Sequence, residues 1–276
     1  MMKVLIVNTS ERTGGAAVAA NRLKDALNSN GIEANMLVRD KLSDDTTVFT
    51  IKNDWRTQWN KLWERWCIFW HLHFSKHNLF AIDIANTGTD ITQLQAFKDA
   101  DVVHLAWINQ GMLSLKGIEK ILKTGKPLVW TMHDIWPATA VCHITLDCRQ
   151  FETQCKDCRL LPSGIGKSLA QRTWKRKEAI EGRSHIIYIT CSKWLQGEAK
   201  RSALIGQNPI ECIPNPIDTN IFCKADKAEA RRKLGLPTDK RLILFASQRV
   251  TNQNKGMGYL VDACRKMVEQ HPETLA

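Results

Sequence analysis

Two cations in the last part of the sequence lie where a phosphate group could bind. Arg249 follows a short apolar run at residues 242–245, and Lys255 stands six residues later, where a helical pattern begins. Open α/β sheets bind ligands at the carboxyl ends of their strands, and two cations at such an end suit a diphosphate. Each residue alone is more often an ordinary surface cation, so the pattern gains weight only together with other signals.

A glycine pair near the amino terminus offers a second element for phosphate binding. Gly14 and Gly15 stand between an apolar run at residues 4–7 and a helical pattern that stops at Asn30-Gly31. Glycines at this place let the backbone approach a ligand, and the first N–H groups of the helix are free to bind phosphate. The segment is not GxGxxG, so the dinucleotide fingerprint is absent. A tight turn without a ligand remains an equal alternative.

Four cysteines form a third candidate site. They are Cys142, Cys148, Cys155 and Cys158, and the last two form a CxxC pair. Four thiolates would give Zn²⁺ a closed tetrahedral shell, which predicts a structural zinc and not a catalytic one. The first two gaps are wider than in a usual zinc knuckle, so partly buried free thiols are the alternative. Disulfides are less expected, because no export signal precedes the chain and the cytoplasm keeps thiols reduced.

An aromatic stripe runs through residues 55–74. Helical steps of three or four residues separate its members, Trp55, Trp59, Trp63, Trp66, Trp70 and Phe74. Such stripes more often pack onto a sheet or a partner chain, so burial is the favoured prediction. The alternative is a membrane interface, where Trp is enriched and where Arg and Lys of the same helix would meet anionic lipid.

The chain carries a formal net charge of +11, which points to a polyanionic partner such as nucleotide phosphates, an anionic membrane or nucleic acid. Part of this charge lies in a basic run formed by Lys167, Arg172, Lys175, Arg176, Lys177 and Arg183. A solvated helix face is the commoner explanation of such a run. The other cations are spread out, and no RRM, KH or helix-turn-helix signature appears, so nucleic acid is not an expected partner.

The elements that must position these residues alternate along the chain. Strands are predicted from apolar runs at 4–7, 34–38, 47–51, 102–105, 127–130, 186–189 and 210–213, with helices at 16–27 and 113–123. Near-continuous apolar strands that alternate with helices predict a parallel sheet covered on both faces, a Rossmann-like α/β fold.

A proline pair divides the chain into two predicted domains. Pro214 and Pro216 forbid regular structure and predict a hinge between residues 1–215 and 216–276. The second part begins a new α/β unit, with a strand at 242–245 and a helix at 256–269. Such a unit is too small to bury both faces of a sheet, so the domain is expected to be incomplete.

The order of these segments resembles family 4 glycosyltransferases. Residues 213–222 are similar to the family's IPNGVD hinge, residues 231–237 to its RxxLGLP helix, and the Arg249 to Gly256 segment to its Arg…Lys-Gly motif. The Gly-Gly-Ala start, the DVVHL segment at 101–105 and the TMHD segment at 131–134 match as well. The resemblance covers residues 3 to about 270 and implies a GT-B fold, with an acceptor-side domain followed by a donor-binding domain. It is strongest with members that build bacterial surface polysaccharides.

The resemblance implies an enzyme, a retaining transferase of the hexosyltransferase type. It would move a sugar from a nucleoside-diphosphate donor to a glycan or lipid-linked acceptor, with no catalytic metal. Arg249 and Lys255 would stabilise the leaving phosphate, Gly14 and Gly15 would bind the same diphosphate, and His133 would contact the sugar at the reacting centre. A cap of a loop or helix is the alternative role of His133.

One departure from the family limits what the chain is expected to do. The family's E-x7-E segment has no counterpart before Ala276, so the chain is expected to be truncated and to lack part of the active site. The expected location is the cytoplasm, or the inner face of the cytoplasmic membrane as a peripheral protein. The competing functions are a basic nucleic-acid-binding protein and an interaction protein held by zinc. A dinucleotide oxidoreductase is disfavoured by the missing GxGxxG.

Overall fold

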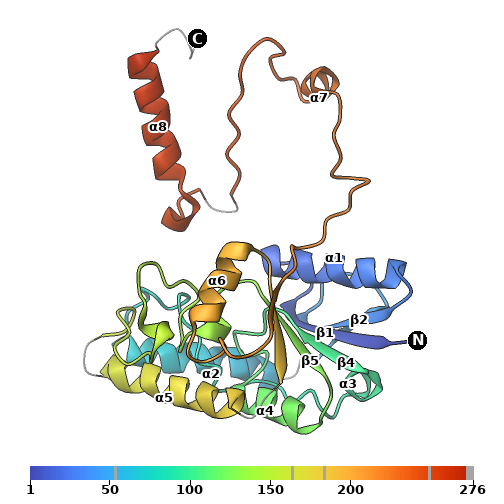
Figure 1. Ribbon diagram of the computed structural model, residues 1–276, viewed down its shortest axis with the longest axis vertical. Helices are drawn as coiled ribbons and strands as arrows, with labels where there is room; N and C mark the ends of the chain where they lie inside the picture. Colours follow the sequence, from blue (N-terminus) through green and yellow to red (C-terminus); the bar gives the residue numbers. More distant parts are fainter. Residues whose placement is uncertain (53–54, 163–164, 183–184, 248–249, 272–276) are drawn as a thin grey trace. The chain divides into compact units, whose positions relative to one another are not determined.

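A single parallel sheet forms the centre of the first part of the chain (Figure 1). The computed structural model describes residues 1–52, 55–162, 165–182, 185–247 and 250–271. Two residues named above, Arg183 and Arg249, lie outside these ranges. The chain divides into two compact units, Met1–Thr219 and Asn220–Ala276.

The seven strands of the first unit follow the order β3-β2-β1-β4-β5-β6-β7, and all neighbours are parallel. They are β1 (Lys3–Ser10), β2 (Glu33–Asp40), β3 (Val48–Thr50), β4 (Val102–Leu105), β5 (Leu128–Met132), β6 (Ile186–Thr190) and β7 (Ile210–Cys212). Each of the seven apolar runs singled out in this part of the sequence forms a strand. The predicted Rossmann-like α/β architecture of this unit is therefore confirmed.

Helices cover both faces of the sheet, with α1 on one side and α2, α4 and α5 on the other (Figure 1). The helices of the unit are α1 (Gly15–Ser29), α2 (Trp55–His71), α3 (Gln95–Asp99), α4 (Leu115–Lys123), α5 (Ile165–Glu181) and α6 (Lys193–Arg201). Short 3₁₀ turns follow β5 at Trp136–Ala138 (η1) and Gln150–Glu152 (η2). Among the described helices, none has the length and apolar character needed to cross a bilayer.

The side chains of β1 show how the sheet is buried on both faces. Val4 and Ile6 pack into a cluster on the α1 side, whereas Leu5 and Val7 join the larger cluster on the other side. Neighbouring residues of a strand point to opposite faces, so a strand buried on both faces needs an uninterrupted apolar run. This requirement explains why the strands were visible in the sequence.

The basic run on α5 is not solvated throughout. Lys175 and Arg176 are exposed, as predicted for a solvated face, but Lys177 is only 4% exposed. Its Nζ donates to the carbonyl oxygens of Trp136 at 2.6 Å and Thr139 at 2.9 Å, and lies 3.3 Å from the centre of a Trp136 ring. Burial lowers the pKa of Lys177 to about 7. At this position the prediction of a solvated cation is wrong.

The second unit contains α7 (Lys227–Lys233), the 3₁₀ turn η3 (Gln253–Lys255) and α8 (Met257–Gln270). The helix predicted at 256–269 is confirmed by α8. The strand predicted at 242–245 is wrong, since these residues are irregular and Leu244 is 89% exposed. A strand requires a hydrogen-bonded neighbour, and within the described part of this unit there is no second strand to pair with.

The aromatic stripe forms a helix, α2, but the prediction that the stripe packs onto the sheet is wrong, and packing onto a partner chain stays a prediction. The exposed fraction of the five Trp side chains lies between 43 and 72%. The buried residues of the helix are instead Thr57, Glu64, Arg65 and Ile68. The helical period is confirmed, but the side that packs into the domain carries Glu64 and Arg65 beside Ile68, and not the Trp stripe.

Candidate functional site

The loops after β1 and β4 meet at the carboxyl edge of the sheet. The strand order changes direction here, because β2 follows β1 on one side and β4 lies on the other. The Thr9 backbone N–H donates to the Trp107 carbonyl at 2.8 Å, and the Thr9 hydroxyl donates to the Asn109 carbonyl at 2.9 Å. In open α/β sheets, such a change of strand direction leaves a crevice in which ligands bind.

The amino end of α1 lies at this edge of the sheet, and its first residues are accessible. Gly14 precedes the helix with φ at +89°, and no heavy atom lies within 4 Å of where a Cβ would stand on Gly14 or Gly15. No side chain caps the helix, and its first turn holds no acidic residue. The neighbouring Glu11 carboxylate is buried and accepts the backbone N–H of Leu42 at 2.6 Å. The N–H groups at the start of α1 are therefore accessible and not neutralised by a nearby carboxylate, as an anion site requires.

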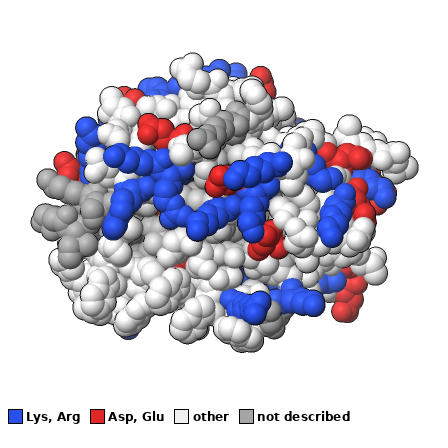
Figure 2. Space-filling model, turned by 90° about the horizontal axis from the view of Figure 1, so that it is seen from below, with Lys and Arg blue, Asp and Glu red and all other residues white. Residues whose placement is uncertain are grey.

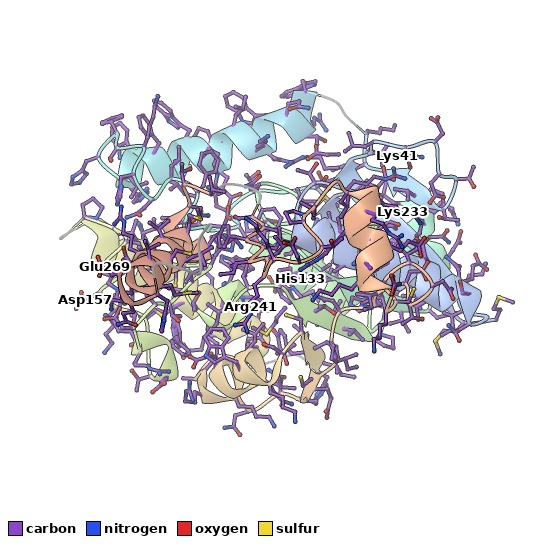
Figure 3. The ribbon with its side chains drawn as sticks, turned by 90° about the horizontal axis from the view of Figure 1, so that it is seen from above. Lys41, His133, Asp157, Lys233, Arg241 and Glu269 are labelled. Atoms are coloured by element: carbon purple, nitrogen blue, oxygen red, sulfur yellow. The ribbon has the colours of Figure 1, made fainter. Side chains whose placement is uncertain are left out.

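His133 follows β5 at the same edge (Figure 3). It lines an apolar groove of about 360 Å³ between α1 and residues 213–216, together with His104 on β4. The Nε2 of His104 lies 2.7 Å from the hydroxyl of Thr131. Burial lowers the pKa of His133, although the charge of Asp134 opposes the shift, and burial lowers the pKa of His104 to about 4. Both imidazoles are thus held in the neutral form near neutral pH.

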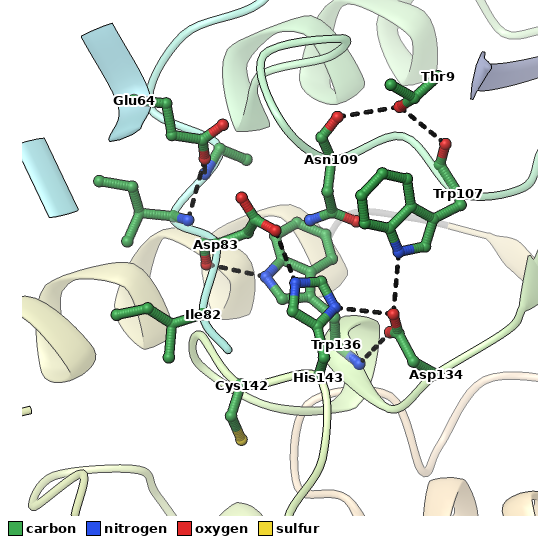
Figure 4. A network of polar contacts seen from close by, with 12 residues as sticks. Thr9, Glu64, Ile82, Asp83, Trp107, Asn109, Asp134, Trp136, Cys142 and His143 are labelled. Atoms are coloured by element: carbon green, nitrogen blue, oxygen red, sulfur yellow. Dashed lines mark hydrogen bonds and ion pairs between the residues drawn. The ribbon is translucent and has the colours of Figure 1, made fainter. Parts of the chain in front are cut away.

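A chain of buried charges supports the loop that carries His133 (Figure 4). The His143 ring lies between two carboxylates, with Nδ1 at 2.7 Å from Asp134 and Nε2 at 2.6 Å from Asp83. The second oxygen of Asp83 pairs with the guanidinium of Arg65 on α2. Because ionised carboxylates only accept hydrogen bonds, this geometry fits the imidazolium form of His143, in which both ring nitrogens donate.

Asp134 is held in place from several directions. Its carboxylate accepts the indole N–H of Trp107 at 3.0 Å and the backbone N–H of Trp136 at 2.9 Å. Burial would raise the pKa of Asp134, but the charge of His143 and these hydrogen bonds outweigh burial, and the pKa is lowered. Asp134 therefore stays ionised and fixes the backbone directly after His133.

This network was not predicted from the sequence, because its members come from distant segments. Asp83 and His143 are 60 positions apart, and a single antiparallel bridge between Ile82 and Cys142 brings them together. One signal was present, since Asp83 is an acid inside an apolar run, between Ile82 and Ile84. A charge at such a position is buried and needs a partner.

The other predicted phosphate ligands belong to the second unit. Lys255 ends η3 and is exposed, and Gly256 follows it with φ at +77° as the residue before α8. Arg249 lies outside the described residues. The predicted position of Lys255 at the start of a helix is confirmed, and its role as a phosphate ligand stays a prediction.

The four cysteines of the predicted zinc site lie near one another. Burial, together with the smaller effect of the Cys158, Cys155 and Cys148 thiolates, raises the pKa of Cys142 to about 12, although a hydrogen bond with Thr139 opposes the shift. Burial likewise raises the pKa of Cys155 to about 11. Across the part of the chain that the structure describes, however, no three His, Cys, Asp or Glu side chains are placed to hold a metal ion. The four thiols of this loop therefore do not form a closed coordination shell for a metal. All nine cysteines of the chain are free thiols.

The zinc site stays a prediction with a direct measurement. If the thiolates close around a metal, elemental analysis of protein purified under reducing conditions should give about one zinc per chain. Cys155→Ser should remove most of this zinc, because a tetrahedral site loses a ligand. Cys223→Ser is the matched control, since Cys223 is an exposed thiol of the second unit and should leave the zinc content unchanged. Zinc near zero in the wild type would show that the four thiols are only structural.

The solved structures that are similar to this chain include two α-glucosyltransferase complexes. One holds UDP and a 13-mer DNA with a central A:G mismatch, with 10% identity, a TM-score of 0.37, and coverage of 80% of this chain and 43% of that chain. The other holds UDP and a 13-mer DNA with an HMU base, with 11% identity, a TM-score of 0.38, and coverage of 84% and 45%. The chain thus spans less than half the length of these enzymes. The expectation that nucleic acid is not a partner stays a prediction.

Comparison at the level of sequence is more decisive. No curated protein matches the chain. The family model described as Glycosyltransferase Family 4 matches residues 13–221, which include the glycine loop, the segment around His133 and the proline hinge. The match covers most of the chain and agrees with the parallel Rossmann-like sheet of a GT-B domain. The chain belongs to glycosyltransferase family 4.

Proposed function

We propose that residues 1–215 form the acceptor-side domain of a retaining glycosyltransferase and that residues 216–276 belong to its donor-binding domain. The enzyme transfers a hexose from a nucleoside diphosphate to a glycan or lipid-linked acceptor in polysaccharide biosynthesis. In this reaction the bond between the sugar and the β-phosphate breaks, and a bond to an acceptor hydroxyl forms on the same face of the sugar. Family membership supports sugar transfer. The observation that carries the donor side is the open, uncapped amino end of α1 at Gly14.

The residues have distinct roles in this proposal. Gly14 and Gly15 present backbone N–H groups to the diphosphate, where the partial positive charge of the helix end favours the anion. His133 contacts the sugar at the reacting centre, and its neutral imidazole can accept or donate a hydrogen bond there. Arg249 and Lys255 stabilise the negative charge that grows on the leaving phosphate. These two cations then stabilise the leaving phosphate, as a metal ion does in other transferases. The proposed mechanism therefore includes no catalytic metal.

Calorimetric titration of the protein with UDP and GDP tests the phosphate ligands. Wild type should bind one of them with a dissociation constant between roughly micromolar and millimolar. Lys255→Ala should weaken this binding by roughly ten- to a hundredfold, since one charge-assisted contact to phosphate is lost. Lys266→Ala, which removes an exposed lysine on α8, is the control and should bind as wild type does. Equal affinity in all three proteins would remove Lys255 from the site.

The glycine loop allows a second matched comparison in the same titration. Gly14 and Gly31 flank α1, both have positive φ, and both have open space where a Cβ would stand. Alanine strains the backbone at both positions, and Gly14, with φ at +89° and ψ at 165°, is in a region that only glycine adopts readily, so the stability of both variants is measured alongside. Only Gly14→Ala disturbs the amino end of the helix, so only this variant should lose nucleotide affinity, by about tenfold. If Gly31→Ala has the same effect, the loss is one of stability and the glycine loop does not bind the donor.

A further inference from the structure

The α2 helix buries charged side chains and exposes aromatic ones, which is the reverse of an ordinary surface helix. The Glu64 side chain is fully buried, and its Oε1 accepts the backbone N–H groups of residues 84–85 at 3.1 and 2.7 Å. The Arg65 guanidinium donates to the Leu79 carbonyl at 2.6 Å and pairs with Asp83. The charged residues thus attach the helix to the protein, while its Trp residues face outward. In water this arrangement is unfavourable, because each Trp leaves a large apolar area exposed.

The outward face forms a continuous apolar surface, named here the Trp face. It consists of Trp55, Trp59, Leu62, Trp63, Trp66, Trp70, Phe74 and Phe80, whose exposed fractions lie between 43 and 72%. Trp59 and Trp63 stack with ring centres 6.0 Å apart, and Trp70 meets Phe74 edge to face at 5.2 Å. A groove of about 530 Å³ runs along this face. Contiguous exposed apolar surfaces of this kind mark interaction sites in soluble domains.

The helix cannot rotate to hide this surface, because its other side is locked to the domain. A Cβ on Gly111 would lie 2.7 Å from the backbone nitrogen of Lys61 and 2.8 Å from the carbonyl carbon of Asn60, so the loop touches the helix backbone directly. The Asn60 side chain also accepts a hydrogen bond from Thr87 at 2.5 Å. Together with the buried Glu64, these contacts fix which face of α2 looks outward.

Exposed cations border the Trp face. Lys52 and Arg56 lie at the start of α2 and Lys76 follows its end, and all three are exposed. The neighbouring helix α5, which contacts α2, adds the exposed Lys175 and Arg176. Figure 2 looks onto the layer of α2, α4 and α5 and shows Lys and Arg gathered in a band across it. The surface therefore combines an aromatic stripe with flanking positive charge.

We propose that the Trp face and the cations beside it bind the surface of an anionic lipid membrane, with α2 lying in the plane of the interface. Trp rings prefer the boundary between headgroups and acyl chains, and each Lys or Arg near an anionic membrane adds attraction. A second copy of the chain fits less well, because packing two such faces together would bring their flanking cations near one another. The anionic headgroups of a membrane neutralise the same charges. This inference concerns binding alone and does not depend on the proposed sugar transfer.

Vesicle sedimentation tests the proposal on the wild-type protein. Vesicles of phosphatidylcholine with about 30% phosphatidylglycerol should sediment the protein, and vesicles of phosphatidylcholine alone should bind it far more weakly. The triple variant Trp59→Gln, Trp63→Gln, Trp66→Gln should lose about a hundredfold or more in affinity, because three interfacial rings are removed. Lys175→Glu with Arg176→Glu should lose about tenfold on the anionic vesicles.

Trp194→Gln is the matched control. Trp194 is 68% exposed on α6, outside the Trp face, so its variant should bind vesicles as the wild type does. Circular dichroism should show that the triple variant stays folded, since its three Trp side chains are exposed. Unchanged binding of the triple variant would overturn the proposal. Failure of the wild type to bind anionic vesicles would also overturn the proposal. This includes the outcome in which sedimentation velocity shows that two copies of the chain pair through the Trp face.

Discussion

Asp83→Ala is expected to lower the free energy of unfolding by about 3 to 5 kcal/mol, equivalent to a fall in melting temperature of roughly 6 to 20 °C. Asp83 is 1% exposed and is the only carboxylate among the described residues that pairs with both Arg65 and His143. Arg65 is a buried residue of α2, and without Asp83 its guanidinium keeps only the Glu64 carboxylate, 3.9 Å away, as a counter-charge among the described residues. A buried charge that loses its nearest partner is among the most costly defects a fold can carry.

Asp147→Ala provides the control for this effect. Asp147 also pairs with an arginine, Arg159 at 2.5 Å, but its side chain is 85% exposed. Water screens such a pair, so its loss should leave the melting temperature unchanged. Thermal and urea unfolding followed by circular dichroism measure both variants. Similar stability of the two variants would mean that the Asp83 network is not a stabilising feature of the fold.

Acid should destabilise the wild type, and His104→Gln should remove the part of this loss that comes from His104. Burial holds the pKa of His104 at about 4 in the folded protein, with a smaller contribution from the charge of His133, against a usual value of 6.5. The unfolded chain therefore binds a proton as the pH falls through 6.5, while the folded protein does so only near pH 4. Stability from neutral His104 is fully present above pH 6.5 and is lost as the pH falls to 4. The loss amounts to about 3 kcal/mol.

The measurement is urea unfolding of wild type and His104→Gln at several pH values between 7 and about 4. Glutamine can keep the hydrogen bond to Thr131 but carries no titratable group, so the difference in stability between the two proteins isolates His104. His77→Gln, at an exposed position, should instead follow the wild-type curve. If wild type and His104→Gln show the same dependence on pH, the pKa of His104 is not lowered in the folded protein.

The sheet could be predicted from the sequence because parallel strands buried on both faces need uninterrupted apolar residues. The same logic failed at residues 242–245, which have the composition of a buried strand but no strand to pair with in the described part of their unit. Apolar composition indicates that a segment can be buried. The segment forms a strand only where a neighbouring strand is available for hydrogen bonding.

The candidate site could be predicted only in part. Gly14 and His133 follow strands directly, so the order of the elements alone places them at the carboxyl edge of the sheet. The Arg65–Asp83–His143–Asp134 network could not be found in this way, because it depends on loops whose paths are set by tertiary contacts such as the bridge between Ile82 and Cys142. The orientation of α2 was missed for the same reason, since helical periodicity identifies two faces and cannot say which one is anchored.

In α2, the residues needed for folding differ from the residues that face outward. In most surface helices the apolar residues are needed for folding. In α2 folding depends on Glu64 and Arg65, and the outward Trp residues contribute little to the folded core. Directed evolution for soluble expression alone would therefore replace these Trp residues early and retain Glu64 and Arg65. If such replacements leave the fold intact and abolish vesicle binding, the Trp residues serve binding and not folding.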